Sequence, residues 1–240
     1  MRTHCKHATT ANLPWLPYAG GVSDQQPAEP SLRDRKRART RQALVDAAID
    51  LFERDGYEQT TIADIAAAAE VGSRTFFNYF TSKEELLFPD SDARVRATIE
   101  AIAERGPNDG PTDVLLRALH GVGSGADGSA TDDMTGGLAG LRLRLIRTVP
   151  AVRSRALQIQ LDAQREIASH LAQAFPETLD ELTAAAVTGA FIGAITAALQ
   201  VLLERSDRPD DPAEFHRVLR HATDLALAPW SAAAAPAPTS

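Results

Sequence analysis

The chain has 240 residues, enough for one large domain or two small ones, and 44% of them are hydrophobic. Its formal net charge of −7 argues against a general polyanion binder, so any nucleic-acid role has to come from a local basic patch. The single cysteine, Cys5, excludes an intramolecular disulfide and a cysteine zinc cage.

The composition favours an all-α fold class. Aromatic residues make up only 5% of the chain, and alanine, the best helix former, is abundant. No stretch shows the period-two alternation of a strand. The first residues lack the apolar segment of a signal peptide, so we expect a cytoplasmic protein.

Both ends of the chain are expected to be disordered tails, over residues 1–31 and 228–240. Prolines and glycines interrupt every periodicity in the first tail, and the second is a low-complexity run of Ala and Pro. His4, Cys5 and His7 could suggest a metal clip, but three ligands on a loose tail are more often incidental. We therefore predict no metal site and no cofactor.

A basic segment follows the first tail, with six Lys or Arg among the nine residues from Arg33 to Arg41. Within it, Arg35, Arg37 and Arg39 are candidates for entering a minor groove or following phosphates. A solvated charge run is the ordinary alternative. The position of the segment, directly before the helical pattern described next, favours the DNA interpretation.

Three helices are predicted from about residue 35 onward, over about 35–54, 62–69 and 73–80, and the first of them includes most of the basic segment. Gly56 supplies a helix stop, Thr61 an N-cap, and Val71 with Gly72 a short turn between the second and third helices. Two helices this short need a third beneath them to bury their apolar faces. The pattern therefore predicts a helix-turn-helix unit, whose second short helix fits a major groove.

The exposed side chains of that helix test the prediction. If Ile65, Val71, Phe76 and Phe80 fill the interior, a polar set faces outward. Its members are Ser73, Arg74, Thr75, Asn78 and Tyr79. Arg pairs with guanine and Asn with adenine, while Thr61 and Lys83, each next to a helix N-terminus, suit phosphates.

The second half of the chain is predicted to hold six longer helices, with a mobile loop over 123–137. The uncharged run from Ala184 to Leu203 is long enough to cross a bilayer, but its Ala, Gly and Thr content favours a buried helix. Small residues recur there at every fourth position, and this spacing predicts either a dimer seam or tight core packing. They are Ala185, Gly189, Gly193 and Ala197.

The ligand-binding candidates lie in one helix, over about 138–149. Leu141 and Leu145 belong to its apolar face, and Arg142 and Arg147 are interspersed cations. Leucines at helical spacing are more often core than pocket, and solvated faces explain most such arginines. The four residues are therefore candidates that the sequence alone does not separate from packing residues.

The run from Thr60 to Leu87 (TTIADIAAAAEVGSRTFFNYFTSKEELL) resembles the N-terminal signature of the TetR family of transcriptional regulators. The resemblance implies that Thr61, Thr75, Tyr79 and Lys83 contact the DNA backbone. It also implies that Ser73, Arg74 and Asn78 read bases. Two positions depart from the family pattern: Gly72 stands where a serine is common, so Ser73 would cap the helix, and Phe77 replaces a tyrosine that meets a phosphate.

The resemblance further implies a DNA-binding domain over 32–88 and a ligand-binding and dimerisation domain over 89–227. A homodimer would then bind a palindromic operator as a repressor and leave it when a small apolar or amphipathic effector binds. The run from Leu141 to Arg155, with the RTFFNYF segment, is similar to the mycofactocin-regulator branch of the family. This likeness implies an acyl-CoA or another amphipathic anion as effector.

The sequence also bears on two other classes of function, an enzyme and a helical scaffold. An enzyme is not expected, because the histidines are scattered and the sequence has no nucleophile motif, phosphate-binding loop or HExxH. A helical protein-interaction scaffold without DNA binding is the alternative hypothesis. Arg74, Asn78, Tyr79 and the basic segment count against it.

Overall fold

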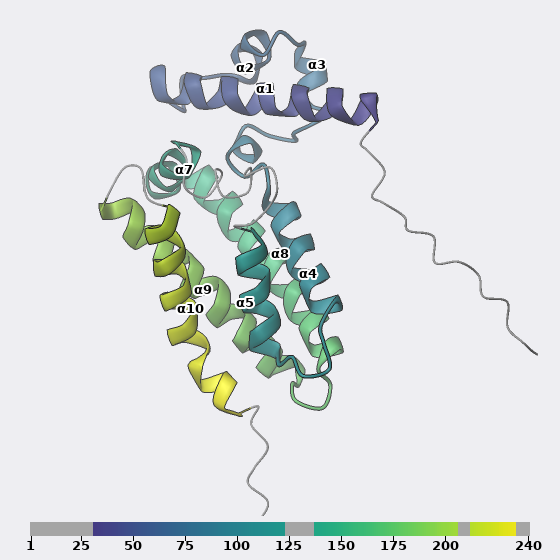
Figure 1. Cartoon of the computed structure of the whole chain (residues 1–240). Helices are drawn as coiled ribbons and strands as arrows, with labels where there is room; N and C mark the ends of the chain where they lie inside the picture. Colours follow the sequence, from purple (N-terminus) through teal and green to yellow (C-terminus); the bar gives the residue numbers. More distant parts are fainter. Residues whose placement is uncertain (1–30, 123–136, 206–211, 234–240) are drawn as a thin grey trace, which may run out of the picture.

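The computed structural model describes residues 31–122, 137–205 and 212–233, and every regular element among them is helical. Figure 1 shows a small N-terminal group of helices lying across one end of a bundle of longer helices. The predicted all-α class is confirmed. The His4, Cys5 and His7 group and most of both predicted tails lie outside the described residues.

The N-terminal domain consists of α1 (Leu32–Arg54), α2 (Ile62–Ala68), α3 (Ser73–Phe76) and the 3-10 helix η1 (Glu84–Leu87). The first helix begins at an N-cap, Ser31, whose side chain accepts a hydrogen bond from the Asp34 amide at 3.2 Å. It ends before Gly56, which adopts φ +91°. Because this conformation is strained for residues with a Cβ, Gly56 serves as the predicted stop.

The helix α2 starts with a capping box. The Asp64 amide donates to the Thr61 hydroxyl at 3.2 Å, and the Asp64 carboxylate accepts from the Thr61 amide at 2.9 Å. The predicted Thr61 cap is therefore confirmed. By contrast, α3 begins after Gly72 with no side-chain cap, so the prediction that Ser73 caps it is wrong: Ser73 is already the first helical residue.

Large apolar side chains fill the interior of this domain as the sequence predicted. Ile65, Phe76 and Phe80 are buried, and Val71 packs against them. Leu44, Leu51 and Phe52 of α1 close the same cluster from below. The two short helices are thus held on α1 in the arrangement that the apolar spacing requires.

The second domain contains α4 (Ser91–Ala103), α5 (Pro111–Val122), α7 (Gly137–Thr148), α8 (Pro150–Ala174), α9 (Glu181–Arg205) and α10 (Pro212–Ala233). In Figure 1, α4, α5, α8, α9 and α10 run along the bundle, and α7 lies at its end beneath the N-terminal domain. A second apolar cluster joins α4, α5, α8, α9 and α10.

The helix α10 passes the predicted boundary of the C-terminal tail at 228. It continues through Pro229 to Ala233, although proline leaves one carbonyl of the preceding turn without its helical partner. Leu227 and Trp230 pack on the second cluster, and the Ser231 hydroxyl donates to the Thr112 hydroxyl at 3.2 Å. Tertiary contacts therefore extend a helix that composition alone ended.

The helix α9 is apolar and long enough to cross a membrane by length and composition, over Glu181–Leu202. It packs instead along α8 and α10, and 28% of its most apolar window is buried. The expected buried helix is therefore covered by two neighbours but keeps a side that is apolar and exposed. Leu182 and Val201 lie on that exposed side.

Candidate DNA-binding surface and effector pocket

The polar residues predicted to face DNA do lie at one surface. Ser73, Arg74 and Asn78 are exposed, whereas Thr75 and Tyr79 are half-buried beside the core. The predicted helix over 73–80 is α-helical only to Phe76 and continues in tighter turns, with Asn78 N donating to Thr75 O at 3.1 Å. The structure thus brings these side chains together on a compact, convex element.

Phe77, at the position where the family pattern has a tyrosine, is exposed at this surface. Its ring is 56% exposed and contacts Phe76 edge-on, with the ring centroids 5.4 Å apart. An exposed phenyl ring on a recognition element offers apolar contact with a thymine methyl group but no hydrogen bond to phosphate. Sequence reasoning noted the substitution without predicting the exposure.

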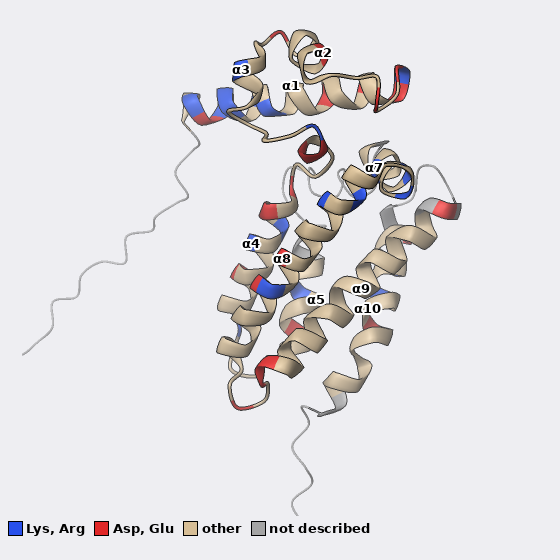
Figure 2. Ribbon diagram, turned by 180° about the vertical axis from the view of Figure 1, so that it is seen from behind, with Lys and Arg blue, Asp and Glu red and all other residues tan. Residues whose placement is uncertain are grey.

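The basic segment forms the first turns of α1, where Figure 2 shows a concentration of Lys and Arg next to α3. Arg35, Arg37 and Arg39 are exposed, and the Arg37 guanidinium lies 5.6 Å from the centre of the Tyr79 ring. The start of α1 and the α3 region that carries Arg74 therefore present one basic surface in an acidic chain. Arg41 is different: its guanidinium lies over Phe80 and donates to the Pro89 carbonyl.

Lys83 has a structural role that the sequence did not indicate. Its ammonium donates to the carbonyls of Tyr57 at 2.7 Å and Thr60 at 3.0 Å, and it lies over the Tyr57 ring. These bonds hold the loop that ends at the Thr61 cap. Two of three ammonium donors are used in this way, and the phosphate contact of Lys83 stays a prediction.

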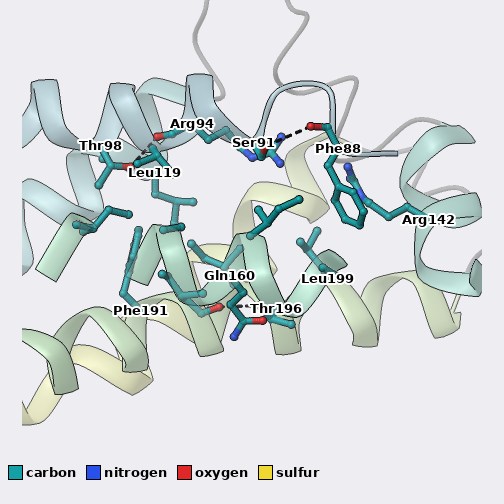
Figure 3. A pocket seen from close by; sticks show the side chains of 18 of the residues that line it. Phe88, Ser91, Arg94, Thr98, Leu119, Arg142, Gln160, Phe191, Thr196 and Leu199 are labelled. Carbon is teal, nitrogen blue, oxygen red and sulfur yellow. Dashed lines mark hydrogen bonds between the residues drawn. The ribbon is translucent and has the colours of Figure 1, made fainter. Parts of the chain in front are cut away.

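The second domain contains a hollow of about 300 Å³ between α4, α5, α7, α8 and α9. Figure 3 shows Phe88, Ser91 and Arg94 along one wall, Arg142 beside Phe88, and Gln160 and Thr196 opposite. Most of the lining is aliphatic or aromatic. Among its described lining residues the charged ones are both arginines, Arg94 and Arg142.

The helix α7 has two faces, and the predicted ligand-binding residues divide between them. Arg142 lines the hollow, together with Ile146 one turn later. Leu141 and Leu145 point the other way and are buried in the apolar cluster of the N-terminal domain, so they lie away from the hollow. Arg147 also lies away from it: it is exposed and 3.4 Å from Glu204.

A polar connection between the two domains was missed by sequence reasoning. The Arg155 guanidinium of α8 lies 2.6 Å from the Glu85 carboxylate of η1, and the second Glu85 oxygen accepts from the Thr81 amide at 2.5 Å. Thr81 directly follows residues 73–80, the predicted recognition segment. No sequence spacing could reveal this pair, because seventy residues separate its members.

The stripe of small residues on α9 does not lie on one face. Ala185 and Gly189 are half-buried toward α8, where a Cβ added to Gly189 would come within 2.9 Å of the Gln164 amide. Gly193 and Ala197 are exposed. Residues four apart advance about 40° around a helix, so the stripe rotates from the internal packing surface to the outer one.

Comparisons with known proteins decide the family. Residues 44–88 match the family model described as bacterial regulatory proteins, tetR family, and residues 137–229 match the MftR C-terminal domain. The regulator TcmR of Streptomyces glaucescens is 32% identical over 155 residues, which cover 65% of this chain and 69% of TcmR. The chain belongs to the TetR family.

Two further comparisons, one of sequence and one of structure, agree with this assignment. The repressor LfrR of Mycolicibacterium smegmatis is 34% identical over 90 residues, covering 38% of this chain and 47% of LfrR. A TetR-family regulator structure from Syntrophomonas wolfei superimposes with a TM-score of 0.54 at 20% identity, covering 80% of this chain and 96% of that one. At this identity the structural likeness concerns the fold.

Membership confirms the resemblance drawn from residues 60–87 and identifies the chain as a transcriptional regulator of a helix-turn-helix family. TetR-family regulators bind DNA as dimers and respond to small molecules. The match of residues 137–229 also agrees with the mycofactocin-regulator likeness of the second half. The comparisons thus favour a regulator over the helical scaffold.

Proposed function

We propose that this TetR-family chain is a repressor that binds a palindromic operator as a homodimer and is released by a small apolar or amphipathic effector. The observation that carries the proposal is the exposed group of Ser73, Arg74 and Asn78 beside the basic start of α1. In a chain with net charge −7, this concentration of cations and base-pairing side chains is local. Such a surface supports sequence-dependent DNA binding.

The proposed contacts divide into two kinds. Arg74 and Asn78 would read base edges in the major groove, and the Phe77 ring would add contact with a thymine methyl group. Phosphates would be bound by Thr61 at the N-terminus of α2 and by Thr75, Tyr79 and Lys83 around the recognition segment. The exposed Arg35, Arg37 and Arg39 would follow the backbone or enter the neighbouring minor groove.

We place the dimer seam on the exposed side of α9. Leu182, Gly193, Ala197 and Val201 lie on this side, and Leu225 of the adjacent α10 is also exposed. Small residues allow close approach of a partner helix, and the flanking leucines and valine supply apolar area. Ala185 and Gly189 would then support the seam from behind by packing on α8.

The hollow of the second domain is the proposed effector site. Its volume of about 300 Å³ suits a small ligand body, and its apolar wall with two arginines suits an amphipathic anion. An acyl-CoA could place only part of its structure in such a space. We therefore propose that an acyl chain or ring system occupies the hollow while an anionic group meets the arginines.

The first experiment is selection of bound sequences from a random DNA pool by the purified full chain at near-physiological salt. We expect a palindrome with half-sites about one helical turn apart. Arg74→Ala and Asn78→Ala should each cost about 1–3 kcal/mol of operator binding and relax one position of each half-site. Arg165→Ala, which removes an exposed arginine of α8, is the matched control.

Sequence-indifferent binding by the wild type would overturn the repressor proposal. Unchanged selectivity in both Arg74→Ala and Asn78→Ala would overturn the assignment of the recognition surface, even if a palindrome is found. Loss of selectivity in Arg165→Ala as well would show that the effect is general charge or folding rather than base recognition.

A further inference from the structure

The short linker between η1 and α4 has an unusual set of hydrogen bonds. Three successive carbonyls each accept a hydrogen bond from a side chain: Leu87 from Arg142 Nη1 at 3.0 Å, Phe88 from the Ser91 hydroxyl at 3.2 Å, and Pro89 from Arg41. Arg41 belongs to the DNA-binding domain and Arg142 to the second domain. The linker is thus held from both sides by arginine side chains.

Arg142 is also part of the proposed effector site. It lines the hollow of about 300 Å³ and an adjoining one of about 240 Å³. Its guanidinium lies 5.8 Å from the centre of the Phe88 ring, and that ring lines the larger hollow as well (Figure 3). One side chain therefore contacts both the linker backbone and the space that a ligand would fill.

The far side of the linker leads directly into the DNA-binding domain. Leu87 is fully buried in the cluster that includes Phe76 and Phe80. Glu85, two residues earlier, accepts from the Thr81 amide at the end of the recognition segment. A change in the position of the Leu87 carbonyl has to be accommodated by this packed cluster, because close-packed interiors transmit displacement rather than absorb it.

Guanidinium chemistry determines how a ligand could act at this point. A carboxylate accepts two parallel N–H donors from one guanidinium, whereas the Leu87 carbonyl accepts one. A carboxylate in the hollow that takes Nη1 of Arg142 as one of its two donors therefore competes with the linker for that donor. A neutral group of the same shape fills the hollow without this competition.

We propose that Arg142 is the residue through which a carboxylate-bearing effector acts: the carboxylate takes the guanidinium from the Leu87 carbonyl and releases the linker. This inference rests on the proposed effector site and names the chemistry and regulation of that site. The effector can shift the protein only as far as it prefers the released state, and the salt bridge to Arg142 supplies the preference. Arg142 is thus both the specificity-determining residue for the anion and the positioning residue for the linker.

The first test compares ligands that differ only in charge. Binding of decanoate and 1-decanol, and of 2-naphthoate and 2-naphthalenemethanol, is measured by calorimetry on the full chain at near-neutral pH. We expect at least one carboxylate to bind about tenfold more tightly than its alcohol, as for a charge-assisted bidentate pair. Arg142→Met should remove this preference, so that the ratio of carboxylate to alcohol affinity falls to about one.

Arg147→Met is the matched control, because it removes an exposed arginine from the same helix outside the lining of the hollow. It should keep the full preference for the carboxylate. If neither carboxylate binds more tightly than its alcohol in the wild type, the anion assignment is overturned. Retention of the preference in Arg142→Met overturns the role of this residue.

The second test reports on the linker and starts with the wild type. Amide hydrogen exchange over residues 81–90 should accelerate several-fold with the carboxylate and remain unchanged with the alcohol. Arg142→Met should show the faster exchange without any ligand. Unchanged or slower exchange with a tightly bound carboxylate would mean that the anion binds without releasing Leu87, and the switch would be overturned.

Neither measurement contains DNA, so their outcomes are independent of the repressor proposal. Failure to select a palindrome, with carboxylate binding and linker release intact, would reject the proposed operator function alone. A palindrome with no carboxylate preference would reject the switch and leave the operator function standing.

Discussion

Phe76, Ile65 and Leu44 lose all accessible surface at the centre of the DNA-binding domain. The second domain also has a packed cluster, in which Leu115 and Leu171 are fully buried, but a hollow of about 300 Å³ lies beside it. Both domains are built from helices of similar apolar periodicity. The difference is that part of the apolar surface in the second domain lines this space instead of packing against another helix. A surface that recognises bases has to be rigid, whereas a receptor has to keep room for its ligand.

At the junction between the domains, the single helix α7 both packs into a filled core and lines the hollow. The face of α7 that bears Leu141 and Leu145 packs into the filled interior, and the opposite face with Arg142 and Ile146 lines the hollow. One helix therefore contacts both the recognition unit and the proposed effector site. Any ligand that displaces α7 acts on two differently packed regions at once.

Replacing one buried phenylalanine in each domain with alanine tests this difference in packing most directly. Phe76→Ala removes a fully buried ring from a filled core and should cost about 3–5 kcal/mol of unfolding free energy. Phe191→Ala removes a ring that already borders the hollow, so less packing is lost and the cost should be about half as large. Urea unfolding of the two variants gives the values.

Ligand binding supplies the second readout for this pair. Phe191→Ala should enlarge the hollow and change the affinity for decanol, while Phe76→Ala should leave that affinity unaltered under conditions where the second domain remains folded. Equal losses of stability in the two variants would show that the hollow is as well packed as the recognition core. The comparison between the domains would then be wrong.

The connection between the domains predicts a smaller effect. Arg155 and Glu85 form a pair whose side chains are 34% and 21% exposed, so Arg155→Met should cost about 1–2 kcal/mol, between the surface and buried limits. Operator affinity should fall along with stability, because Glu85 also holds the Thr81 amide. Thermal unfolding and DNA titration measure the two effects.

Arg165→Met is the control for this prediction. Its partner Asp162 and Arg165 itself are 71% and 79% exposed, so the change should cost less than about 0.5 kcal/mol. A stability loss in Arg155→Met no larger than in this control would mean that the pair does not couple the domains.

The smallest expected effect is a loss of stability at low pH. Hydrogen bonds from the Thr61 hydroxyl and amide lower the pKa of Asp64, so the capping box stabilises α2 fully above the ordinary carboxyl pKa and is lost as pH falls through the folded value. Burial opposes the charge of Glu84, but hydrogen bonds from Tyr57 and Ser82 outweigh it and lower its pKa. The DNA-binding domain should therefore lose stability below about pH 4.

Asp64→Asn separates the cap from the other carboxylates, because asparagine has no charge to lose. Chemical unfolding followed from about pH 6 to pH 3 should show a shallower decline for this variant than for the wild type. Identical slopes would mean that Asp64 contributes nothing to the pH dependence. The cap would then act through hydrogen bonding alone.

The sequence by itself determined the recognition unit, because its signals are local. Gly56, the Thr61 cap and the spacing of Ile65, Phe76 and Phe80 each specify a turn, a helix start or a buried face within a few residues. The side chains left outside, Arg74 and Asn78 among them, follow from that burial. The family resemblance rests on the same local signals, because most of the residues that carry it lie in this part of the chain.

Only the tertiary structure decided how the second domain uses its residues. Periodicity indicates that one face of α7 is apolar, but not that Leu141 faces the DNA-binding domain while Arg142 faces a hollow. The packing of Trp230 likewise carried α10 past the predicted tail boundary. Long arginine side chains reach carbonyls and carboxylates far away in sequence, and which partner each one meets is set by the relative placement of whole helices.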